Sequence, residues 1–418
     1  MSREMKDSGV EWIGAIPKDW NVCKQKHLIQ MINGRAYKDS EFQEEGKYKV
    51  LRVGNLFTNP NWYYSDLELE KDKYCDNGDL LYTWSMSYAP VIWRGEKVIY
   101  HYHIWKTKIS YELDKKFAYY YLLSLTASLM AEKHETTMSF VTMGVMNNSY
   151  ITYPHLTEQH RIADFLDAKC AQIAEISKKI QEEIDTLEEY KKSVIIEAVT
   201  KGLDPDAEMK DSGDKWIGKI PVEWDIKKGK YIFDIFGGSI NEKNLSFTEE
   251  HGWKPIVYYK VDDMNNTSDG YYMQQKNHYY TNSNVVPFKA PLILIPKRGA
   301  AISTNKVRIT NYDCYFDPNV MALSTSDDIR YYQYVLVGRS LVDIADINTI
   351  PQINNKHINS LVLPAPPLEI QKTIADYLDE RCCVIRNAIE QKNKQLSILE
   401  EYKKSLIYEY VTGKKEVA

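Results

Sequence analysis

The first candidate for chemistry is a stretch that comes within one residue of a phosphate-binding loop. Gly213–Lys219 has the spacing G-x-x-x-x-G-K, in which backbone amides and a lysine hold the phosphates of a nucleotide. Ile220 stands where the pattern needs Ser or Thr, and Pro221 stands where such a loop would begin a helix. The same stretch occurs earlier in the chain, with Ala15 in place of the lysine. We therefore predict no nucleotide-binding loop here.

Three further stretches resemble reactive or metal-binding sites and fall short of them. Asn59–Trp62 and Asp317–Val320 each miss part of the (D/N/S)-P-P-(F/Y/W) tetrapeptide of amino-methyltransferases. His101 and His103 offer two imidazoles, but no third ligand stands at metal spacing. No G-x-G-x-x-G follows an expected strand, and no P-D…E-x-K nuclease cluster occurs. The sequence therefore predicts a chain with no catalytic centre, no metal site and no cofactor of its own.

The composition is that of a globular protein long enough for two or more domains. Of 418 residues, 44% are hydrophobic and 27% are charged, and the net charge is −5. No apolar run approaches the roughly 20 residues that cross a bilayer, and the amino terminus shows no apolar signal region. The six cysteines form no C-x-x-C pair and no zinc spacing, which fits a reducing compartment. We expect a cytoplasmic protein without membrane contact.

An internal repeat determines the expected architecture. MKDSGVEWIGAIPKDW, at Met5–Trp20, returns as MKDSGDKWIGKIPVEW at Met209–Trp224. Gly213–Lys219, the stretch that resembles a phosphate-binding loop, is part of the second copy. What the copies share is D-S-G-x-x-W-I-G-x-I-P-x-x-W, which predicts a segment that enters each domain and docks its Trp and Ile side chains there.

Each copy of this entry segment is followed, later in the chain, by the pattern of a long helix. Glu158–Cys170 corresponds to Ile370–Cys382, and Leu187–Ser193 recurs at Leu399–Ser405 with the same offset. Both stretches lack Gly and Pro, and their apolar residues stand three and four apart, as in a coiled-coil seam. The expected seam residues are Ile162, Leu166, Ile173, Ile176, Ile180, Ile184, Leu187 and Val194 in the first copy, and Ile374, Leu378, Ile385, Ile389, Leu396, Leu399 and Leu406 in the second.

These repeats predict an α+β fold with a pseudo-twofold internal repeat. Two strand-rich heads alternate with two long helices, which we expect to end near Gly202 and Gly413 and to pair as an antiparallel coiled coil that separates the heads. At roughly 1.5 Å per residue, each helix would span on the order of 60 Å. The predicted domains are a head at 1–155, a helix at 156–204, a head at 205–363 and a helix at 364–418.

The two heads share few residues but show a common strand pattern. β-branched and aromatic runs between turn residues predict strands at Lys47–Phe57, Asp79–Trp84 and Lys97–Ile109, and at Trp253–Val261, Ala290–Pro296 and Val320–Ser324. The helix offset places Leu80–Thr83 over Leu292–Ile295, and it aligns the loops that follow, Trp84–Tyr88 and Lys297–Ala301. The ends of the heads, Ser139–Pro154 and Thr349–Pro364, correspond as well. A shared scaffold with differing loops suits domains that recognise different targets.

With these features in view, the sequence resembles the specificity (S) subunits of type I restriction–modification systems. The resemblance rests on the repeated order of head and helix, the G-D-L-L strand at Gly78–Leu81, the segment Ile350–Pro367, and the I-A-D-(F/Y)-L-D helix starts. It covers essentially the whole chain and is loosest in the middle of each head.

The resemblance implies a non-catalytic subunit that gives a complex its DNA specificity. Each head would be a target recognition domain that reads one half of a bipartite, asymmetric site in double-stranded DNA, and the helices would set the gap between the halves. Two adenine methyltransferase subunits would dock on the helices and bring S-adenosylmethionine. Two motor-nuclease restriction subunits, where present, would bring ATP and Mg²⁺.

Candidate DNA-binding residues are polar, cationic or aromatic side chains on the loops of the heads, which are slightly basic while the first helix is acidic. Lys297-Arg298-Gly299 is the strongest candidate, because its glycine allows the backbone to approach DNA closely. His101 and His103 are weaker candidates. The full set is Arg35, Tyr37, Lys38, Arg52, Asn55, Trp84, Ser85, Ser87, Tyr88, Lys260, Lys297, Arg298, Asn305, Lys306 and Arg308.

Three alternatives stay open at this point. The chain could be the specificity subunit of a related system in which methylase and nuclease are fused. It could be a coiled-coil scaffold whose two heads bind protein, or a nucleotide-hydrolysing enzyme that uses Lys219.

Overall fold

The computed structural model describes residues 3–85, 87–131, 141–238, 246–247, 256–267, 270–274, 280–281, 286–346 and 350–417. The chain divides into two compact units. Unit 1 consists of Met1–Ile180 and Lys394–Ala418, and unit 2 is Gln181–Asn393. Each unit therefore contains one head and a part of both long helices.

The two long helices are α4 (Leu156–Lys201) and α9 (Leu368–Val411). Each is followed closely by a glycine with left-handed backbone, Gly202 with φ 79° and Gly413 with φ 69°, as the stop signals predicted. Within unit 1 the start of α4 lies beside the end of α9, where the rings of Phe165 and Tyr410 are 4.5 Å apart. Within unit 2, Glu183 of α4 forms an ion pair with Lys392 of α9. The expected antiparallel pairing of the helices is thus present in each unit.

The helix seam agrees with the prediction except at one residue. Ile162, Leu166, Ile173 and Ile184 are buried in α4, whereas the side chain of Ile176 is 48% exposed. At roughly 100° per residue, Ile184 returns to the direction of Ile173 after three turns, while Ile176 points about 60° away from it. In α9 the buried seam residues are Ile374, Leu378, Ile385, Ile389 and Leu406.

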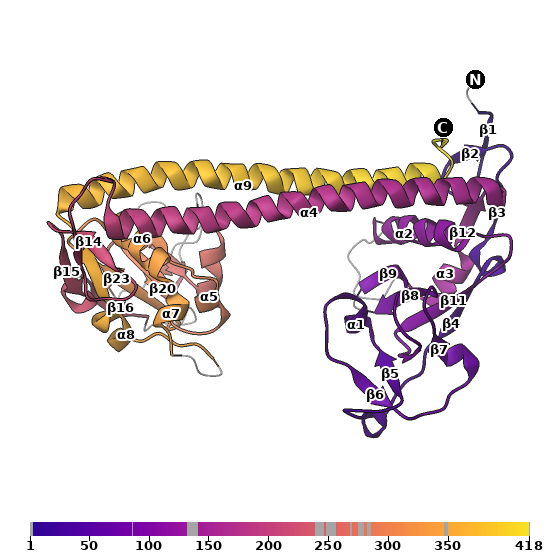
Figure 1. Ribbon diagram of the computed structural model, residues 1–418, viewed down its shortest axis with the longest axis horizontal. Helices are drawn as coiled ribbons and strands as arrows, with labels where there is room; N and C mark the ends of the chain where they lie inside the picture. Colours follow the sequence, from indigo (N-terminus) through magenta and orange to yellow (C-terminus); the bar gives the residue numbers. More distant parts are fainter. Residues whose placement is uncertain are drawn as a thin grey trace. The chain divides into compact units, whose positions relative to one another are not determined.

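Unit 1 is an α+β head whose helix α2 lies between the sheets and α4 (Figure 1). Two four-stranded sheets have the orders β4-β11-β8-β9 and β6-β5-β10-β7, and β3 pairs with β12. The elements are β1 (Met5–Asp7), β2 (Ala15–Pro17), β3 (Asn21–Lys24), β4 (Ile29–Asn33), β5 (Tyr48–Leu51), α1 (Val53–Phe57), β6 (Tyr63–Ser65), β7 (Tyr74–Cys75), β8 (Leu80–Ser85), β9 (Ser87–Ile92), β10 (Val98–Tyr100), β11 (Ile104–Ile109), α2 (Lys115–Ala131), α3 (Met143–Asn148) and β12 (Tyr150–Tyr153).

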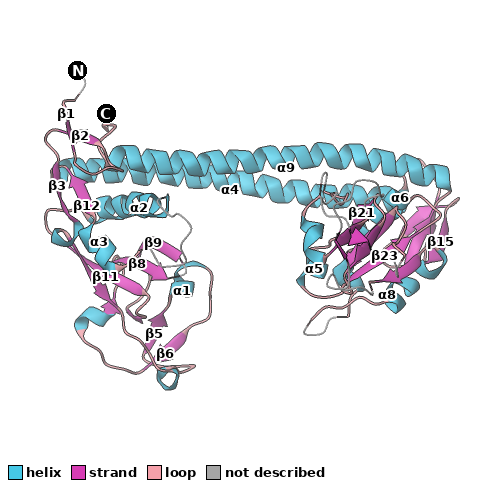
Figure 2. Ribbon diagram, turned by 180° about the vertical axis from the view of Figure 1, so that it is seen from behind, coloured by secondary structure: helices cyan, strands magenta, loops and turns pink. Residues whose placement is uncertain are grey.

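Unit 2 has the same layers as unit 1, and its helix α6 lies on the side of the main sheet that faces the long helices (Figure 2). That sheet has the order β16-β23-β20-β21, and β15 pairs with β24. The elements are β13 (Met209–Asp211), β14 (Lys219–Pro221), β15 (Asp225–Lys228), β16 (Asp234–Gly237), β17 (Ser246–Phe247), β18 (Val257–Tyr259), β19 (Tyr280–Thr281), β20 (Leu292–Pro296), α5 (Ala300–Ser303), β21 (Arg308–Thr310), β22 (Cys314–Phe316), β23 (Val320–Ser324), α6 (Ile329–Arg339), α7 (Leu341–Ile344), α8 (Asn355–Ser360) and β24 (Val362–Ala365).

The two heads share one topology. The antiparallel sheet β4-β11-β8-β9 corresponds strand for strand to β16-β23-β20-β21, and the parallel pair β5 and β10 corresponds to β18 and β22. Strands β8 and β20 occupy the same place in their sheets, so the predicted correspondence of Leu80–Thr83 with Leu292–Ile295 is confirmed. At the head ends, α3 and β12 match α8 and β24 in the same way.

Two of the predicted strands are divided differently in the structure. Lys47–Phe57 forms β5 only as far as Leu51, because Asn55 accepts from the backbone N–H of Arg52 and starts helix α1. Lys97–Ile109 supplies two strands, β10 and β11, that belong to different sheets. The chain turns between them at His101–His103.

The repeated entry segment forms a hairpin, β1-β2 in unit 1 and β13-β14 in unit 2. Gly213–Lys219 makes the tip of the second hairpin, and Lys219 pairs with Asp211 across it. As predicted, Trp20 and Trp224 are buried in their units. Each packs at the end of a long helix, Trp20 beside Gly413, which follows α9, and Trp224 beside Gly202, which follows α4.

A buried glutamine at the start of each long helix fastens the head to the helix. Gln159 of α4 accepts from the backbone N–H of Asp114, just before α2, at 2.7 Å, and donates to the carbonyl of Pro154 at 2.8 Å. In unit 2, Gln371 accepts from the N–H of Asp328 at 3.0 Å and donates to the carbonyl of Pro366 at 2.9 Å. The shared Gln of the repeat is therefore a structural residue.

An aspartate shared by the repeats holds the same head helices, α2 and α6. It lies about two turns after the glutamine on each long helix. Tyr120 of α2 donates to Asp167 at 2.7 Å, and Tyr334 of α6 donates to Asp379 at the same distance. Lys116 and Arg330 add ion pairs to these aspartates. The I-A-D-(F/Y)-L-D motif thus occurs twice because each unit attaches its head in the same way.

Candidate nucleic-acid interface

In head 1, several predicted residues come together at the turn between β10 and β11. The ring of Tyr37 lies 6.3 Å from that of His101, and the ring of Trp84 lies 5.2 Å from that of His103. The two imidazoles are 4.7 Å apart. Residues that are distant in the sequence therefore form one aromatic cluster, because β8 and β11 are neighbours in one sheet.

The histidines of this cluster are neutral at physiological pH. Burial, together with the nearby His103 and Arg52, lowers the pKa of His101 to about 4. Burial and Arg52 also lower the pKa of His103. Each imidazole then offers one N–H donor and one acceptor nitrogen, which suits hydrogen bonding to base edges better than contact with phosphate.

Two arginines flank the cluster. Arg52 is exposed, and its guanidinium lies 5.1 Å from the ring centre of Tyr63. Arg35 lies 5.0 Å from the ring centre of Tyr37, and its charge is paired with Glu41 at 2.7 Å. Arg52 is thus the better placed of the two to contact a phosphate.

The other predicted residues of head 1 have varied surroundings. Asn55 uses its side chain inside the head, where it caps α1 and donates to the carbonyl of Asn61 at 2.8 Å. Lys38 is exposed at the start of a short 3-10 helix, Asp39–Glu41. Ser85 and Ser87 pair at the tip of the β8–β9 hairpin, and Tyr88 pairs with Trp84.

In head 2, the Lys297-Arg298-Gly299 loop follows β20 and is held by its backbone. Lys297 donates its N–H to the carbonyl of Asn319 at 2.7 Å, and Gly299 donates to that of Pro351 at 3.1 Å. Gly299 has φ 82°, a left-handed conformation that other residues rarely adopt. Arg298 is exposed on this loop. The loop therefore presents a cation on a fixed backbone.

The remaining predicted residues of head 2 do not join that loop into one cluster. Asn305 bonds the carbonyl of Val337 at 2.8 Å and the N–H of Leu341 at 2.9 Å, which is a structural role. Arg308 donates to the carbonyl of Met264 at 3.1 Å and lines a hollow beside α4 and α9. Lys260 is exposed at the start of the 3-10 helix Val261–Asn265, and Lys306 is half-buried. DNA contact by any of these residues stays a prediction.

Sequence reasoning missed two residues of the head 1 surface. Tyr102, between the two histidines, is 36% exposed, and its ring lies 4.0 Å from that of His103. Lys49 stands over the ring of Trp62 at 5.5 Å. The H-Y-H triplet was the only available signal for Tyr102, whereas Lys49 and Trp62 are brought together by folding.

The described residues contain neither a metal-binding cluster nor a helix suited to span a membrane. Within those ranges, no three His, Cys, Asp or Glu side chains are grouped in a way that could hold a metal ion. No helix in the described part of the chain is both long and apolar enough to cross a membrane.

Comparison with known proteins places these features in a family context. The family model described as type I restriction modification DNA specificity domain matches residues 17–186 and 221–400. The specificity subunit of the type I restriction enzyme MjaVIII from Methanocaldococcus jannaschii is 25% identical over 423 residues, covering 96% of this chain and 93% of the relative. The putative MjaX specificity subunit of the same organism is 24% identical, with 96% and 95% coverage.

A solved structure shares the fold. It belongs to work on complex assembly and conformational transition of the type I R-M system, and it matches 95% of this chain and 98% of its own with a TM-score of 0.69 at 16% identity.

Proposed function

The chain belongs to the type I restriction–modification DNA specificity family, and from this premise we propose that each of its heads reads one half of a bipartite site in double-stranded DNA. The observation that carries the proposal is the shared topology of two heads with unlike loops. At the ends of the equivalent strands β8 and β20, one head has the β8–β9 hairpin, with Trp84, Ser85, Ser87 and Tyr88 near its tip, and the other has the Lys297-Arg298-Gly299 loop. One scaffold with two different reading surfaces fits the recognition of two different half-sites.

The reading surfaces would combine base contacts with phosphate contacts. In head 1, the neutral imidazoles and the Tyr102 hydroxyl would face base edges, while Arg52 would contact a phosphate. In head 2, the exposed Arg298 would contact a phosphate or the edge of a base from the Lys297-Arg298-Gly299 loop. A bidentate contact between arginine and guanine contributes about 1–3 kcal/mol of discrimination against a wrong base.

The long helices would set the spacing between half-sites and carry the partners. Two adenine methyltransferase subunits would bind them and supply S-adenosylmethionine, and restriction subunits, where present, would supply ATP-driven translocation with Mg²⁺. The chain itself would be non-catalytic. Its own contribution would be to choose which adenines the methyltransferases reach.

Binding measurements with the methyltransferase present test this function. We expect Arg52→Ala and Arg298→Ala each to weaken DNA binding. Each should also reduce the steepness with which the logarithm of the binding constant falls with the logarithm of the salt concentration, by about one. Arg94→Ala in head 1 and Lys289→Ala in head 2 are matched controls: Arg94 is exposed, and Lys289 is paired with Asp313 at 2.7 Å. If the complex showed no preference for any DNA sequence, a protein-binding scaffold would replace this proposal.

A further inference from the structure

Unit 2 contains a polar hollow of about 510 Å³ between its head and the long helices. Residues of α4, α9, α6 and β21 line it, and its volume lies in the range of sites that bind small molecules, roughly 300–1,000 Å³. Two half-buried arginines face it, Arg308 of β21 and Arg386 of α9. Neither guanidinium forms an ion pair with a carboxylate of the described residues. The hollow therefore holds positive charge that the protein itself does not neutralise.

The guanidinium of Arg308 is fixed by the backbone at one side. Its Nε donates to the carbonyl of Met264 at 3.1 Å, and its Nη1 donates to the carbonyl of Val307 at 3.1 Å. Nη2 has no hydrogen-bond partner in the described part of the chain. Burial lowers the pKa of Arg308, because the charge is partly removed from water. A desolvated cation without a counter-ion is unfavourable, and a bound anion would offset that cost.

The side chain of Arg386 reaches the same hollow because a glycine makes room for it. A Cβ at Gly270 would lie 3.0 Å from Nη1 of Arg386, and Gly270 has φ 86°. The guanidinium lies 5.9 Å from the ring centre of Tyr271. It forms no hydrogen bond with any residue that the structure describes. An arginine beside an aromatic ring with its N–H groups unused is well suited to grip a phosphate by two parallel hydrogen bonds.

The scaffold that the two units share does not require these arginines. The constant offset between the long helices gives Arg386 the counterpart Ala174 on α4. Arg308 pairs with strand β20, and the residue that pairs with β8 at the matching place is Pro90. Both cations therefore belong to unit 2 alone.

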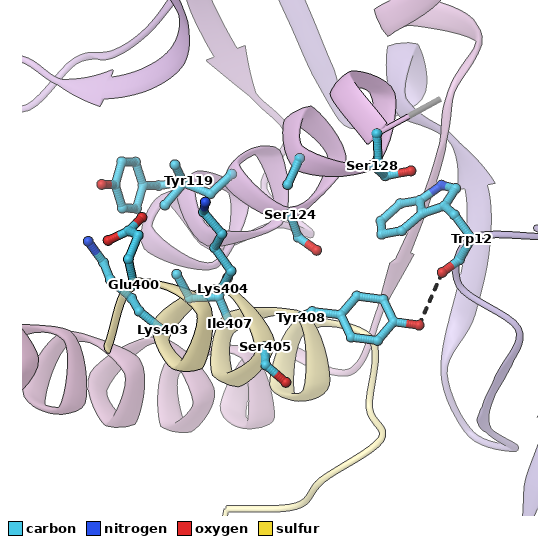
Figure 3. A pocket seen from close by; sticks show the side chains of 13 residues that line it. Trp12, Tyr119, Ser124, Ser128, Glu400, Lys403, Lys404, Ser405, Ile407 and Tyr408 are labelled. Atoms are coloured by element: carbon cyan, nitrogen blue, oxygen red, sulfur yellow. Dashed lines mark hydrogen bonds between the residues drawn. The ribbon is translucent and has the colours of Figure 1, made fainter. Parts of the chain in front are cut away.

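The matching hollow of unit 1 has a different chemistry. It lies between α9 and α2, has a volume of about 760 Å³ and is largely apolar. Figure 3 shows Tyr119 of α2 at its wall, and Trp12, whose carbonyl accepts from the hydroxyl of Tyr408 at 3.1 Å. Lys404 lines this hollow as Lys192 lines that of unit 2. The lysine is thus common to both hollows, whereas the two arginines occur only in unit 2.

The charges around the unit 2 hollow favour a compact anion over a DNA backbone. Two more cations than carboxylates line it. The carboxylates are Glu188 and Glu189, which are exposed on α4, and Glu188 is paired with Lys191 at 2.8 Å. A continuous polyanion would lie against both exposed carboxylates, whereas a small anion can pass them and reach the arginines.

The backbone of the hollow is also unusual. Within the described ranges, two residues other than glycine have a left-handed backbone, Asn305 with φ 49° and Ser340 with φ 67°. Both line this hollow. Strained backbone of this kind is concentrated at sites that bind ligands, where the surrounding structure holds it in place.

We propose that the unit 2 hollow binds a small anion that carries two linked phosphates, either free pyrophosphate or the diphosphate group of a nucleotide. Nη2 of Arg308 and the guanidinium of Arg386 donate to the phosphate oxygens, and Lys192 adds a third positive charge. The site is separate from the surfaces proposed to read DNA. It gives unit 2 a ligand that unit 1 does not share.

Isothermal titration calorimetry of the full chain with inorganic pyrophosphate tests this proposal, in buffer without phosphate or sulfate and at constant ionic strength. We expect one pyrophosphate to bind per chain. Arg386→Ala, which matches Ala174 of unit 1, should weaken binding tenfold or more, and so should Arg308→Met. Arg308→Met also removes two hydrogen bonds to the backbone, so Arg386→Ala is the decisive variant. A parallel titration with adenosine diphosphate distinguishes the two sources: tighter binding than that of pyrophosphate identifies a nucleotide, and equal binding identifies the free anion.

Arg381→Ala is the matched control, because it removes the same charge from an exposed position of α9 outside the hollow. It should bind pyrophosphate as the unsubstituted chain does. No binding by the unsubstituted chain, or equal binding by Arg386→Ala, would overturn the proposal. DNA binding in the presence of the methyltransferase should be unchanged in Arg386→Ala. Weaker DNA binding by this variant, with no binding of pyrophosphate to the unsubstituted chain, would assign the arginine to the DNA backbone and leave the function proposed above standing.

Discussion

The buried glutamine at the start of each long helix offers a strong test of how the heads are attached. Gln159 is fully buried, and Gln371 is 2% exposed. The Gln159 side chain makes three hydrogen bonds to backbone groups, including one to the carbonyl of Glu112 at 2.9 Å. Gln371 makes two. Replacing either glutamine by leucine keeps a similar volume and leaves these backbone groups without a partner.

The expected cost follows from the number of bonds that are lost. A typical hydrogen bond contributes about 1 kcal/mol to stability, and a buried group left unpaired costs about 1–3 kcal/mol. We therefore expect Gln159→Leu to lower the free energy of opening unit 1 by about 3 kcal/mol, and Gln371→Leu to lower that of unit 2 by about 2 kcal/mol. These values correspond to roughly 100-fold and 25-fold faster amide exchange in the regions that open.

Hydrogen exchange followed by mass spectrometry measures this unit by unit. Gln159→Leu should accelerate exchange in α2 and leave α6 unchanged, and Gln371→Leu should do the reverse. Gln172→Leu, at an exposed position of α4, is the control and should stay within about 0.5 kcal/mol of the unsubstituted chain. Equal effects of Gln159→Leu and Gln172→Leu would refute the role given to the buried glutamine.

Three further outcomes are expected from the structure. Folding lowers the pKa of His101 from 6.5 to about 4, so between these pH values the imidazole is more protonated in the unfolded chain than in the folded one. The free energy of unfolding should therefore fall as the pH drops through that window, and less steeply in His101→Phe, as urea titrations at several pH values would show; equal slopes would contradict the burial of this imidazole. Tyr120→Phe and Tyr334→Phe should each lower stability by about 1.5–3 kcal/mol, because each removes a hydrogen bond to a charged aspartate, and no loss on urea denaturation would contradict it. Gly413→Ala should lower the melting temperature more than Gly202→Ala, because the added Cβ would lie 2.4 Å from Pro17, against 3.1 Å from Trp224 for Gly202. Both substitutions also place an alanine in the left-handed conformation, which costs about 1–2 kcal/mol. The opposite order of melting temperatures would contradict this packing.

The helices could be predicted from the sequence because their signals are local and occur twice. Both helices end beside the glycines expected to stop them, Gly202 and Gly413. Only Ile176 was assigned to the wrong face, since a spacing of three alternating with four tolerates a residue about 60° off the seam. The roles of Gln159 and Gln371 were also within reach, because both residues are shared by the repeat.

The heads were less predictable because their contacts are long-range. Lys97–Ile109 reads as one run of strand-forming residues, yet its halves belong to two sheets. The sequence predicts four members of the head 1 cluster only as separate candidates, namely Tyr37, Trp84, His101 and His103. The fold of the sheets brings their rings together. Conversely, Asn305 looked like a loop residue free to bind DNA, but it caps the backbone around α6 and α7. Surface polarity alone cannot separate such roles.

Genome-wide mapping of methylated adenine tests the central claim most directly. The chain is co-expressed with its methyltransferase subunit, and the modified motif is read from the positions of methyladenine. We predict a motif of two specific halves separated by unspecified bases, and exchange of residues 1–155 for those of another family member should change one half only. A single continuous motif, or a motif unaffected by the exchange, would contradict the reading of DNA by two separate heads.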